Sequence, residues 1–584
     1  MPEGHTHFSR DAYLWPMKGR RAWRPIVSGK TWQGRKSGWL TRLLTLGWAI
    51  GLVGKGYGQH MPPRLVVGIV VDQMRADYLR RFVSPKSRGL GRLVREGIVF
   101  WNVHYTYFPT YTGPGHASIY TGATPAFHGI AANTWWERSL GKPYYCVSDT
   151  TVQPVGSPNE AGRRSPRTLL STTITDELRY ATRYQGKVIG IALKDRSAIL
   201  PAGRSGNLAV WFDSESGRWI SSTYYGADLP AWVEAFNARR LPDSLLKRPW
   251  TLSARFACTD DSPHEGHLSG ESNPTFPHQP KTYKDLLLTP AGNLLTLALA
   301  REAIHHEKLG QDKYSDFLCI SLSTPDLVGH LFGTESCEIE ALYKELDAQI
   351  AEFLDYIQRR FRPGEVVVFL TADHGVAPTP EALAERGISA GRFPEKDLVA
   401  GAEDFLHQAL KVPDTVQFIA AYLNQSFYFS PTLTIELRRQ VSNLLKEYLL
   451  KRSDIVAVYT REELTGAGSS YYPISRVQAG YFPARSGDVV VVYASGLIES
   501  EGYTKGTTHG SIWTYDTHVA LIFWWGGVRS ESRYEVVPIT AVAPTLAFLL
   551  GVPLPSAAFS APLLPVIEAW KVPSTFTWEV ITGP

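Results

Sequence analysis

Four short runs of Val, Ile and Leu, each followed by charged residues, constrain the fold of this chain more than any other feature. They are "RLVVGIVVDQM", "GKVIGIALKDR", "DFLCISLSTPD" and "GEVVVFLTADHG". Continuous apolar runs of this length are typical of strands covered on both faces, as in a parallel sheet between helices. Helical patterns such as "NLLTLALAREAIHHE" lie between them. The alternation predicts an α/β fold with a mostly parallel central sheet and helices on both faces.

The polar residues that end these runs predict a functional site. They are Asp72, Lys194, Arg196, Asp326, Asp373 and His374. In open parallel sheets, ligands bind outside the carboxyl ends of the strands, where strand ends and loops converge. A single Asp after a strand is usually a turn residue. Four such strand ends together would instead gather a charged cluster at one edge of the sheet.

The charge of the chain is unevenly distributed. The 584 residues are 44% hydrophobic, which suffices for a large core, and their net charge is +5. The first 60 residues contain ten Lys or Arg and only two acidic residues. The rest of the chain is slightly acidic, so its charge gives no reason to expect a nucleic-acid partner.

Residues 1–59 are predicted to be an N-terminal extension that carries an export signal. A basic start, an apolar run from about Trp39 to Val53 and small residues after it follow the order of a secretory signal. The run is too short and too interrupted for a stable membrane span, unless the leader remains as an uncleaved anchor. The start codon could also lie nearer Met17. We expect a periplasmic or secreted protein.

Residues 64–570 are predicted to form a single catalytic domain. Three stretches within it are rich in Pro, Gly, Trp and Tyr, and we expect them to be insertions that cover the carboxyl edge of the sheet: 134–190, 200–290 and 380–505. Further along, "THVALIFWWGG" predicts another strand and "ITAVAPTLAFLLGVP" predicts a late helix ending at Gly551.

The four cysteines do not form a disulfide framework, and none belongs to a C-x-x-C pair. Cys319 lies inside an apolar run and is predicted to be a core residue. The sequence leaves open a single bridge among Cys146, Cys258 and Cys337.

The stretch "FPTYTGPGHASIYTG", residues 108–122, places Thr112 in a Pro/Gly-rich turn before a helical pattern. A threonine there can merely cap the helix. It can also be a nucleophile, because the positive end of a helix favours an anion. Thr110 is the rival nucleophile, but "TGPGH" begins the turn that enters the helix, which favours Thr112.

Three carboxylates and three imidazoles are candidate metal ligands, with no thiolate among them. They are Asp72, Asp326, His330, Asp373, His374 and His509. Asp326 and His330 are four residues apart, so a helical turn would bring them to one ion. Mixed Asp/His ligation suits Zn²⁺, or alternatively Mn²⁺, Fe or Co, and does not suit Ca²⁺. Six ligands are too many for one tetrahedral ion and about right for two ions.

Two metal ions close together can hold the attacking and leaving oxygens of a displacement at phosphorus. Thr112 would attack as an alkoxide, its hydroxyl acidified by a metal ion. Lys194 and Arg196 would donate to the non-bridging phosphoryl oxygens. Asn133, in "GIAANTWW", could add a neutral hydrogen bond to the same group.

Seven motifs in this order resemble those of the alkaline phosphatase superfamily. They are "DQMRADY", "PTYTGPGHASIYTG", "HGIAANTWW", "ALKDRSAILPAG", "STPDLVGH", "TADHG" and "GTTHG". The chain is most similar to the phosphate-irrepressible, PafA-like alkaline phosphatases of bacteria, over roughly residues 64–550. Each motif alone is weak, but the combination is highly specific.

The resemblance implies an alkaline-phosphatase-like core with cap insertions, two Zn²⁺ ions, phosphate monoesters as substrates and a monomer. By this resemblance, one Zn²⁺ would be bound by Asp326, His330 and His509. The other would be bound by Asp72, Thr112, Asp373 and His374. Thr112 would form a covalent phospho-threonine that water then hydrolyses. Asn133, Lys194 and Arg196 match the phosphate-binding trio.

Two other functions stay open. A type I phosphodiesterase or nucleotide pyrophosphatase shares the two-metal core, but a monoester dianion gains more from Lys194 and Arg196 together than a diester does. A non-catalytic, metal-stabilised binding protein is the more remote alternative. Four further histidines are not included among the ligands: His104, His116 and His128 near the nucleophile turn, and His518, the rival of His509.

Overall fold

The computed structural model describes residues 61–570, apart from residues 85, 254–257, 261, 501 and 503. The predicted extension and export signal, residues 1–59, lie outside the described residues. Within the described part, no helix has both the length and the apolar character needed to cross a membrane.

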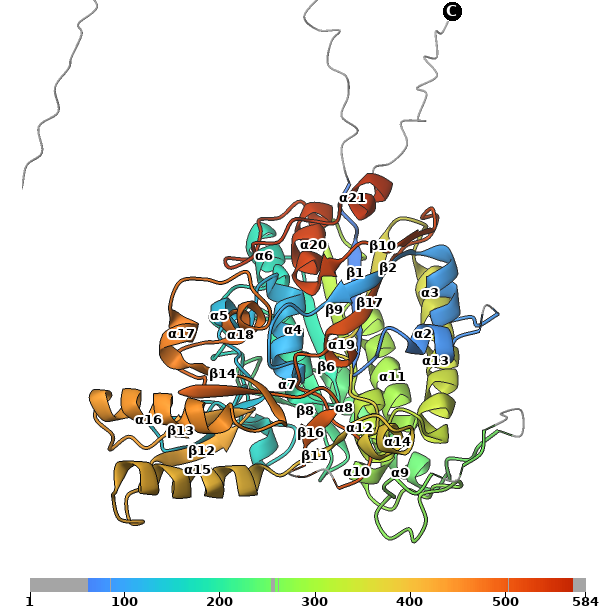
Figure 1. Ribbon diagram of the computed structural model, residues 1–584. Coiled ribbons are helices and arrows are strands. Elements are labelled where there is room, and N and C mark those ends of the chain that lie inside the picture. Colours follow the sequence, from blue (N-terminus) through green and yellow to red (C-terminus); the bar gives the residue numbers. More distant parts are fainter. Residues whose placement is uncertain are drawn as a thin grey trace, which may run out of the picture. The chain divides into compact units, whose positions relative to one another are not determined.

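A large sheet forms the centre of the molecule (Figure 1). Within the described residues it has eleven strands, in the order β18-β2-β17-β10-β1-β9-β6-β7-β8-β5, with β19 beside β2. The short strands β18 (Glu531–Arg533) and β19 (Val537–Pro538) both pair with β2. Its middle is parallel and fully buried, and consists of β10 (Val366–Thr371), β1 (Leu65–Val71), β9 (Asp316–Leu322) and β6 (Val188–Ala192). These strands are the four Val/Ile/Leu runs, so the prediction of a mostly parallel sheet in an α/β fold is confirmed.

The register of the central strands determines where the site lies. Val70 pairs with Thr371, and Val71 pairs with Leu322. Neighbouring parallel strands therefore end at the same level, and the residues that follow them emerge together at one edge of the sheet.

Strand β17 (His518–Trp524) is the run predicted from "THVALIFWWGG", but it is antiparallel to its neighbours β10 and β2 (Ile98–His104). An antiparallel strand enters the sheet at the edge where its parallel neighbours leave it. The loop before β17, with His509, consequently reaches the same edge as the carboxyl ends of β1, β9 and β10.

Helices cover both faces of the sheet (Figure 1). One layer includes α4 (Thr112–Thr121), α6 (Ile174–Ala181), α7 (Asp195–Ala202) and α20 (Val542–Leu550), which pack on one another. The other includes α3 (Leu90–Glu96), α11 (Ala291–His306), α12 (Thr324–Phe332) and α13 (Cys337–Arg360). Helix α20 ends at Gly551, which has a left-handed backbone (φ +65°), as its sequence predicted.

Helix α13 shows how local sequence sets these elements. The Ser336 side chain caps the helix by accepting a hydrogen bond from the Ile339 N–H. Acidic residues lie in the first turn and arginines in the last, which suits the helix dipole. Its apolar residues recur at helical spacing and are buried against α11, α12 and α3.

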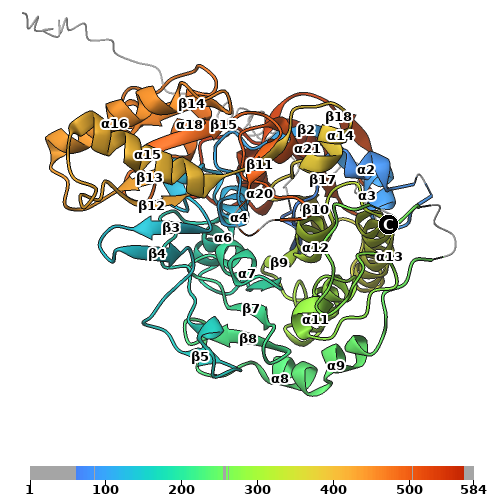
Figure 2. The same ribbon diagram turned by 60° about the horizontal axis from the view of Figure 1, so that its bottom comes forward.

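The predicted insertions differ in what they build. Residues 380–505 form a separate four-stranded antiparallel sheet, which packs with α15 (Glu395–Leu410) and α16 (Ile435–Leu449) around a hydrophobic core of its own (Figure 2). Its strands are β12 (Ile419–Leu423), β13 (Ser426–Phe429), β15 (Val489–Tyr493) and β14 (Ile455–Thr460).

The stretch 200–290 is only partly a covering insertion. Strands β7 (Leu208–Asp213) and β8 (Arg218–Ser222) extend the central sheet beyond β6, and β5 (Pro154–Val155) pairs with β8. Because β7 is buried along its whole length and pairs in parallel with β6, it belongs to the sheet. In the stretch 134–190, β3 (Thr134–Glu137) and β4 (Lys142–Tyr145) form a hairpin that is not part of the central sheet.

The cysteines divide into one pair and two single thiols. Cys258 and Cys337 form a disulfide, the pairing that the sequence left open. Cys146 and Cys319 are free and buried, and Cys319 lies in the core as expected.

Candidate active site

The structure brings the six predicted carboxylate and imidazole ligands together at one edge of the sheet. Asp72 follows β1, Asp326 lies in the first turn of α12 after β9, and Asp373 and His374 follow β10. His509 reaches them from the loop before β17. We call this set, with His330 and Thr112, the catalytic cluster. The arrangement follows from the register of β1, β9 and β10 and from the antiparallel direction of β17.

One half of the catalytic cluster contains Asp72, Asp373 and His374, whose side chains are fully buried. The His374 Nε2 lies 3.5 Å from Asp72 Oδ1 and 3.5 Å from Asp373 Oδ2. The Thr112 hydroxyl lies 3.3 Å from the same nitrogen. Four ligand atoms from three segments of the chain therefore surround one small volume.

The other half contains Asp326, His330 and His509. Asp326 Oδ1 lies 3.2 Å from His330 Nε2 and 3.5 Å from His509 Nε2. The rings of His374 and His509 stack with their centroids 3.5 Å apart, which joins the two halves.

All three imidazoles of the catalytic cluster are held in the same way. Each Nδ1 lies 2.8–2.9 Å from a backbone carbonyl oxygen: that of Thr507 for His330, Gly375 for His374 and Thr110 for His509. A carbonyl oxygen only accepts hydrogen bonds, so Nδ1 carries the proton of each ring. In the neutral form of each ring, Nε2 then presents a lone pair to the cluster, as in imidazoles that bind metals.

The polar atoms of the cluster fit divalent cations. Asp72 Oδ1 is buried and has no hydrogen-bond partner among the described residues. It faces the unprotonated His374 Nε2, so two acceptors meet with no proton between them. Burying acceptors in this way is costly unless a cation lies between them. The donor set of three carboxylates, three imidazoles and one hydroxyl suits zinc.

Lys194 supplies positive charge at the same place. Its Nζ lies 2.7 Å from Asp72 Oδ2 and also bonds to Asp326. Burial, followed by repulsion from Asp326 and Asp373, raises the pKa of Asp72 well above its ordinary value. The Lys194 ammonium thus bonds to two of the three carboxylates, which leaves the cluster with excess negative charge that cations would neutralise.

Thr112 is the first residue of α4 and is 1% exposed. Its hydroxyl lies in the cluster, whereas the hydroxyl of Thr110 donates to the Ser511 carbonyl, 2.8 Å away. Gly115 permits this approach, because a Cβ there would come within 2.2 Å of the Asp373 carbonyl oxygen. The geometry therefore places the Thr112 hydroxyl, and not that of Thr110, among the ligand groups.

The predicted phosphate-binding residues surround Thr112. Arg196 Nη2 lies 3.4 Å from the Thr112 hydroxyl. Asn133 Oδ1 accepts a hydrogen bond from the Gly113 N–H at 2.7 Å, which holds its side chain beside the helix start. Lys194 bonds to Asp72 and Asp326, so all three predicted residues border the cluster.

Tyr145 and Asp195 hold Arg196 and were not predicted from the sequence. Arg196 Nη1 donates to the Tyr145 hydroxyl at 3.0 Å, and that hydroxyl donates to Asp195. Arg164 pairs with the other Asp195 oxygen at 2.8 Å. Asp195 lies between Lys194 and Arg196 in the sequence, which is a local signal. Tyr145 is 51 positions from Arg196, and nothing local marks it.

Gln73 links the two halves and was also missed. Its backbone N–H donates to Asp373 Oδ1 at 3.2 Å, and its side-chain amide donates to Asp326 Oδ1 at 2.9 Å. Its backbone is left-handed (φ +66°), which is uncommon for a residue other than glycine. Gly329 leaves room for it, since a Cβ there would lie 1.8 Å from Gln73 Oε1. The only sequence signal was its position directly after Asp72.

None of the four histidines left out of the prediction joins the ligand groups. His116 comes nearest, 3.3 Å from Asp373 Oδ2, but its ring nitrogens lie 2.9 Å from the Thr112 carbonyl and 3.0 Å from the Ser321 hydroxyl. His128 contacts Ser118, and His104 stacks on His518.

Comparisons with known proteins agree with this geometry. Residues 66–518 match the family described as type I phosphodiesterase / nucleotide pyrophosphatase. The chain is 38% identical over 548 residues to alkaline phosphatase PafA of Elizabethkingia meningoseptica, which covers 91% of this chain and 98% of that protein. It is 36% identical over 508 residues to alkaline phosphatase PhoV of Synechococcus elongatus, covering 85% and 91%.

A solved structure resembles the fold as well. The crystal structure of wild-type alkaline phosphatase PafA superposes with a TM-score of 0.82 at 37% identity, and the match covers 87% of this chain and 99% of that one.

Proposed function

The chain belongs to the type I phosphodiesterase / nucleotide pyrophosphatase family of the alkaline phosphatase superfamily, and from this premise we propose that it is a zinc-dependent phosphomonoesterase acting through a covalent phospho-threonine at Thr112. Its similarity to alkaline phosphatases over most of both chains makes it a phosphatase. One observation carries the mechanism: the Thr112 hydroxyl lies within hydrogen-bond reach of both Arg196 and His374.

Two zinc ions would be held by residues of the catalytic cluster. One ion would have Asp326, His330 and His509 as ligands, and the other Asp72, Thr112, Asp373 and His374. When bound, zinc supplies Lewis acidity, which favours ionised oxygens and offsets the negative charge of a phosphoryl group. Gln73 and the three carbonyl acceptors of the imidazoles would hold these ligands in position.

The reaction proposed for the chain has two displacements. The Thr112 Oγ attacks phosphorus, its bond to phosphorus forms, and the bond from phosphorus to the ester oxygen breaks. The Thr112 hydroxyl gives up its proton, and the departing ester oxygen takes up a proton from solvent to leave as the alcohol. Water then attacks the phospho-threonine and loses a proton, the bond from phosphorus to Oγ breaks, Oγ takes up a proton to regenerate Thr112, and inorganic phosphate leaves.

Arg196 and Lys194 stabilise the charge that develops on phosphorus. The Arg196 guanidinium, held by Tyr145, is oriented toward Thr112 before substrate arrives, and a preorganised cation costs little to align during reaction. Asn133 adds a neutral donor beside the helix start. A monoester dianion has one more charged oxygen than a diester, so two cations reward it more. This charge match supports a monoesterase over a diesterase.

A comparison of substrates tests the proposal. Purified protein with added Zn²⁺ is assayed on an aryl phosphate monoester and on the corresponding bis-aryl diester. We expect the monoester to be preferred at least 100-fold in kcat/KM, a difference of about 3 kcal/mol in transition-state binding. Activity should disappear on chelation and return with Zn²⁺. A preference for the diester, or activity that survives chelation, contradicts the proposal.

We also propose that the protein works outside the cytoplasm, as a monomer. The Cys258–Cys337 disulfide supports an oxidising compartment, and the predicted export signal points the same way. Cell fractionation, sequencing of the mature N-terminus and light scattering test this. Phosphatase confined to the cytoplasmic fraction, with both cysteines reduced, contradicts it.

A further inference from the structure

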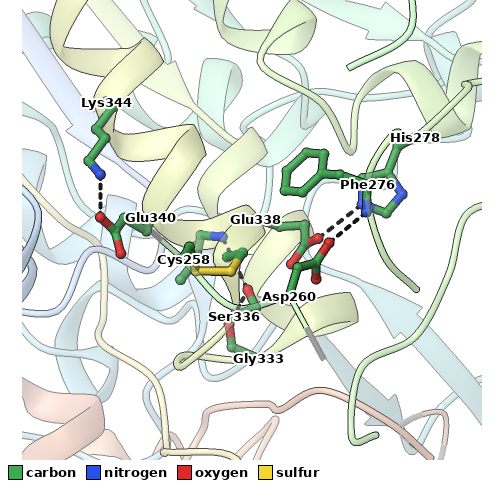
Figure 3. Close-up of a disulfide and its surroundings, with 11 residues drawn as sticks. Cys258, Asp260, Phe276, His278, Gly333, Ser336, Glu338, Glu340 and Lys344 are labelled. Carbon is green, nitrogen blue, oxygen red and sulfur yellow. Dashed lines mark hydrogen bonds and ion pairs between the residues drawn. A yellow bond between two sulfur atoms is a disulfide. The ribbon is translucent and has the colours of Figure 1, made fainter. Parts of the chain in front are cut away.

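A second group of carboxylates lies beside the disulfide, outside the catalytic cluster (Figure 3). Asp260, Glu265 and Glu338 each offer an oxygen atom, and these oxygens lie within 4.8 Å of one another. We call these three residues the carboxylate cluster. Glu338 lies in the first turn of α13, directly after Cys337, and the disulfide ties that helix start to Cys258, two residues before Asp260.

Glu338 is aimed into this group with one oxygen unsatisfied. Its side chain is 0% exposed, and its Oε1 pairs with His278 Nε2 at 3.0 Å. Its Oε2 is buried and has no hydrogen-bond partner among the described residues. In Figure 3 the Glu338 carboxylate turns toward that of Asp260. A buried, unpaired carboxylate oxygen is costly, so it needs an explanation.

Asp260, like Glu338, has one carboxylate oxygen that is bonded and one that is unsatisfied. One of its oxygens accepts a hydrogen bond from the Phe276 N–H at 2.6 Å, which fixes the carboxylate. The other, Oδ1, is buried and likewise has no hydrogen-bond partner among the described residues. Two fixed carboxylates thus each leave a buried oxygen unsatisfied in one small group.

His278 is a cationic group beside the cluster in the described part of the chain, and it does not balance the charge. His278 lies between Glu338 Oε1 and Glu271 Oε2, with 3.0 Å to each, so both of its nitrogens are engaged. It therefore adds one positive charge at the edge of the group and is not itself a candidate ligand. Burial raises the pKa of Glu338 above its ordinary value. The hydrogen bond with His278 lowers this pKa in part, and repulsion from Asp260 raises it.

Glu340 shows what an ordinary acidic residue at this helix start looks like. It lies two positions after Glu338 in the first turn of α13, and it pairs with Lys344 one turn later. The helix dipole and such a pair account for one carboxylate at a helix start. They do not account for three carboxylates that converge.

We propose that the carboxylate cluster is a Ca²⁺ site that clamps residues 258–260 to the start of α13. Its donors are all oxygens, which Ca²⁺ prefers and which distinguishes it from the mixed Asp/His set of the catalytic cluster. The cation would lie between Asp260 Oδ1 and Glu338 Oε2, with Glu265 as the third ligand and water completing the coordination. The disulfide and the ion would then hold the same two segments together. This inference does not depend on the proposed phosphatase mechanism.

Calcium titration tests the site. The purified, zinc-supplied protein is passed over a chelating resin that removes Ca²⁺, is resupplied with Zn²⁺, and is unfolded thermally with increasing CaCl₂. We expect its midpoint to rise by about 2–4 °C at millimolar Ca²⁺. Tb³⁺, a probe for Ca²⁺ sites, should luminesce on excitation of Trp250, whose ring centroid lies 5.7 Å from that of His278.

Two variants on the same helix turn provide the contrast. Glu338→Gln removes a ligand charge and should abolish both the thermal shift and the Tb³⁺ signal that Ca²⁺ displaces. Glu340→Gln removes a neighbouring charge outside the cluster and should leave both intact. If Glu338→Gln does not fold, Asp260→Asn replaces it.

Three outcomes overturn the proposal: no rise with Ca²⁺ in the unaltered protein, an equal rise in Glu338→Gln, or a rise with added Zn²⁺ in place of Ca²⁺. Phosphatase activity is measured on the same samples. Since the carboxylate cluster contributes no residue to the catalytic cluster, activity should stay within two-fold, so failure of this proposal is distinguishable from failure of the proposed function.

Discussion

The catalytic cluster and the carboxylate cluster both gather buried carboxylates, yet they are built differently. In the catalytic cluster the carboxylates follow three adjacent strands whose register sets their spacing. In the carboxylate cluster they come from a loop and a helix start that a disulfide joins. A sheet edge positions ligands accurately enough for chemistry, because paired strands cannot shift singly. A tied loop positions ligands well enough to bind a cation that adds stability.

The neighbours of the two clusters differ in the same sense. Around the catalytic cluster, carbonyl oxygens orient the imidazoles, Lys194 bonds to Asp72, and Arg196 approaches Thr112. The carboxylate cluster has His278 beside it, with both ring nitrogens engaged. Substitutions in the catalytic cluster should therefore alter activity, and substitutions in the carboxylate cluster should alter stability.

The largest effect is expected at the nucleophile. Thr112→Ala should lower kcat/KM for an aryl phosphate by roughly 10⁴-fold or more, because no oxygen remains to form the covalent intermediate. Thr112→Ser keeps a hydroxyl and should retain most activity. Steady-state kinetics and acid trapping of phospho-enzyme measure both. Thr110→Ala is the matched control, and undiminished activity in Thr112→Ala would falsify the mechanism.

The next largest effect separates Arg196 from the residue that holds it. Arg196→Ala should lower kcat/KM for the monoester by about 10²–10³-fold and for a diester by less. Tyr145→Phe keeps the ring but loses the hydroxyl that fixes Arg196, so we expect about a 10-fold loss. Equal losses on both substrates would mean that Arg196 does not recognise the dianion.

Removing the disulfide tests the stability that is expected from the region of the carboxylate cluster. The double variant Cys258→Ala, Cys337→Ala opens a loop closed over a sequence separation of 79 residues. It should lower the free energy of unfolding by about 2–4 kcal/mol and weaken Ca²⁺ binding, with kcat unchanged. Urea unfolding with a parallel activity assay measures this. A loss of kcat before any loss of structure would show that the two clusters are coupled.

Gln73 should affect zinc more than folding. Gln73→Ala removes the amide that bonds to Asp326 and should weaken zinc binding by about 10–100-fold, measured by competition with a chromogenic chelator. Gln425→Ala is the matched control, since Gln425 is also buried with a left-handed backbone (φ +54°) but lies in the turn between β12 and β13 of the separate four-stranded sheet. Equal zinc affinity in the two variants would contradict the positioning role.

The smallest effect concerns the loop that carries His509. Burial raises the pKa of Asp516 to about 7, although the Ser511 N–H, 2.7 Å away, lowers it in part. The neutral form is thus favoured in the folded state. Its contribution to stability is complete below the ordinary pKa of 3.8 and is lost as the pH rises through about 7.

Asp516→Asn should abolish this dependence. Between pH 6 and 8.5 the unaltered protein should lose about 1–2 kcal/mol more unfolding free energy than the variant does. Urea unfolding at three pH values measures the difference. Parallel curves for the two proteins would contradict the raised pKa.

The predictions that rest on local sequence agree with the structure. Burial on both faces selects continuous Val, Ile and Leu, so β1, β6, β9 and β10 were recognised from their runs alone. The direction of β17 was not predictable, because an apolar run reads alike in a parallel and an antiparallel strand. Strand β7 was assigned to an insertion for a similar reason, since its partner β6 is identified only by pairing.

The site residues also divide into those that local sequence reveals and those that it does not. Asp72, Asp326 and Asp373 were found because each follows a recognisable run, and Thr112 because a Gly/Pro turn precedes its helix. Gln73 and Tyr145 escaped because their roles are contacts with side chains 51 to 300 positions away. The two unsatisfied oxygens of Asp260 and Glu338 were not predictable either, because only the fold brings residue 260 beside residue 338.

By itself, the sequence determined the kinds of element, the residues at strand ends and the chemical types of the ligands, because each of these follows from side chains close together in the chain. Only the tertiary structure decided which ligands share a volume, which imidazole nitrogen faces it, and which cysteines join. Those outcomes depend on strand register, strand direction and packing between distant segments, and interactions over such separations leave no pattern within any short stretch of residues.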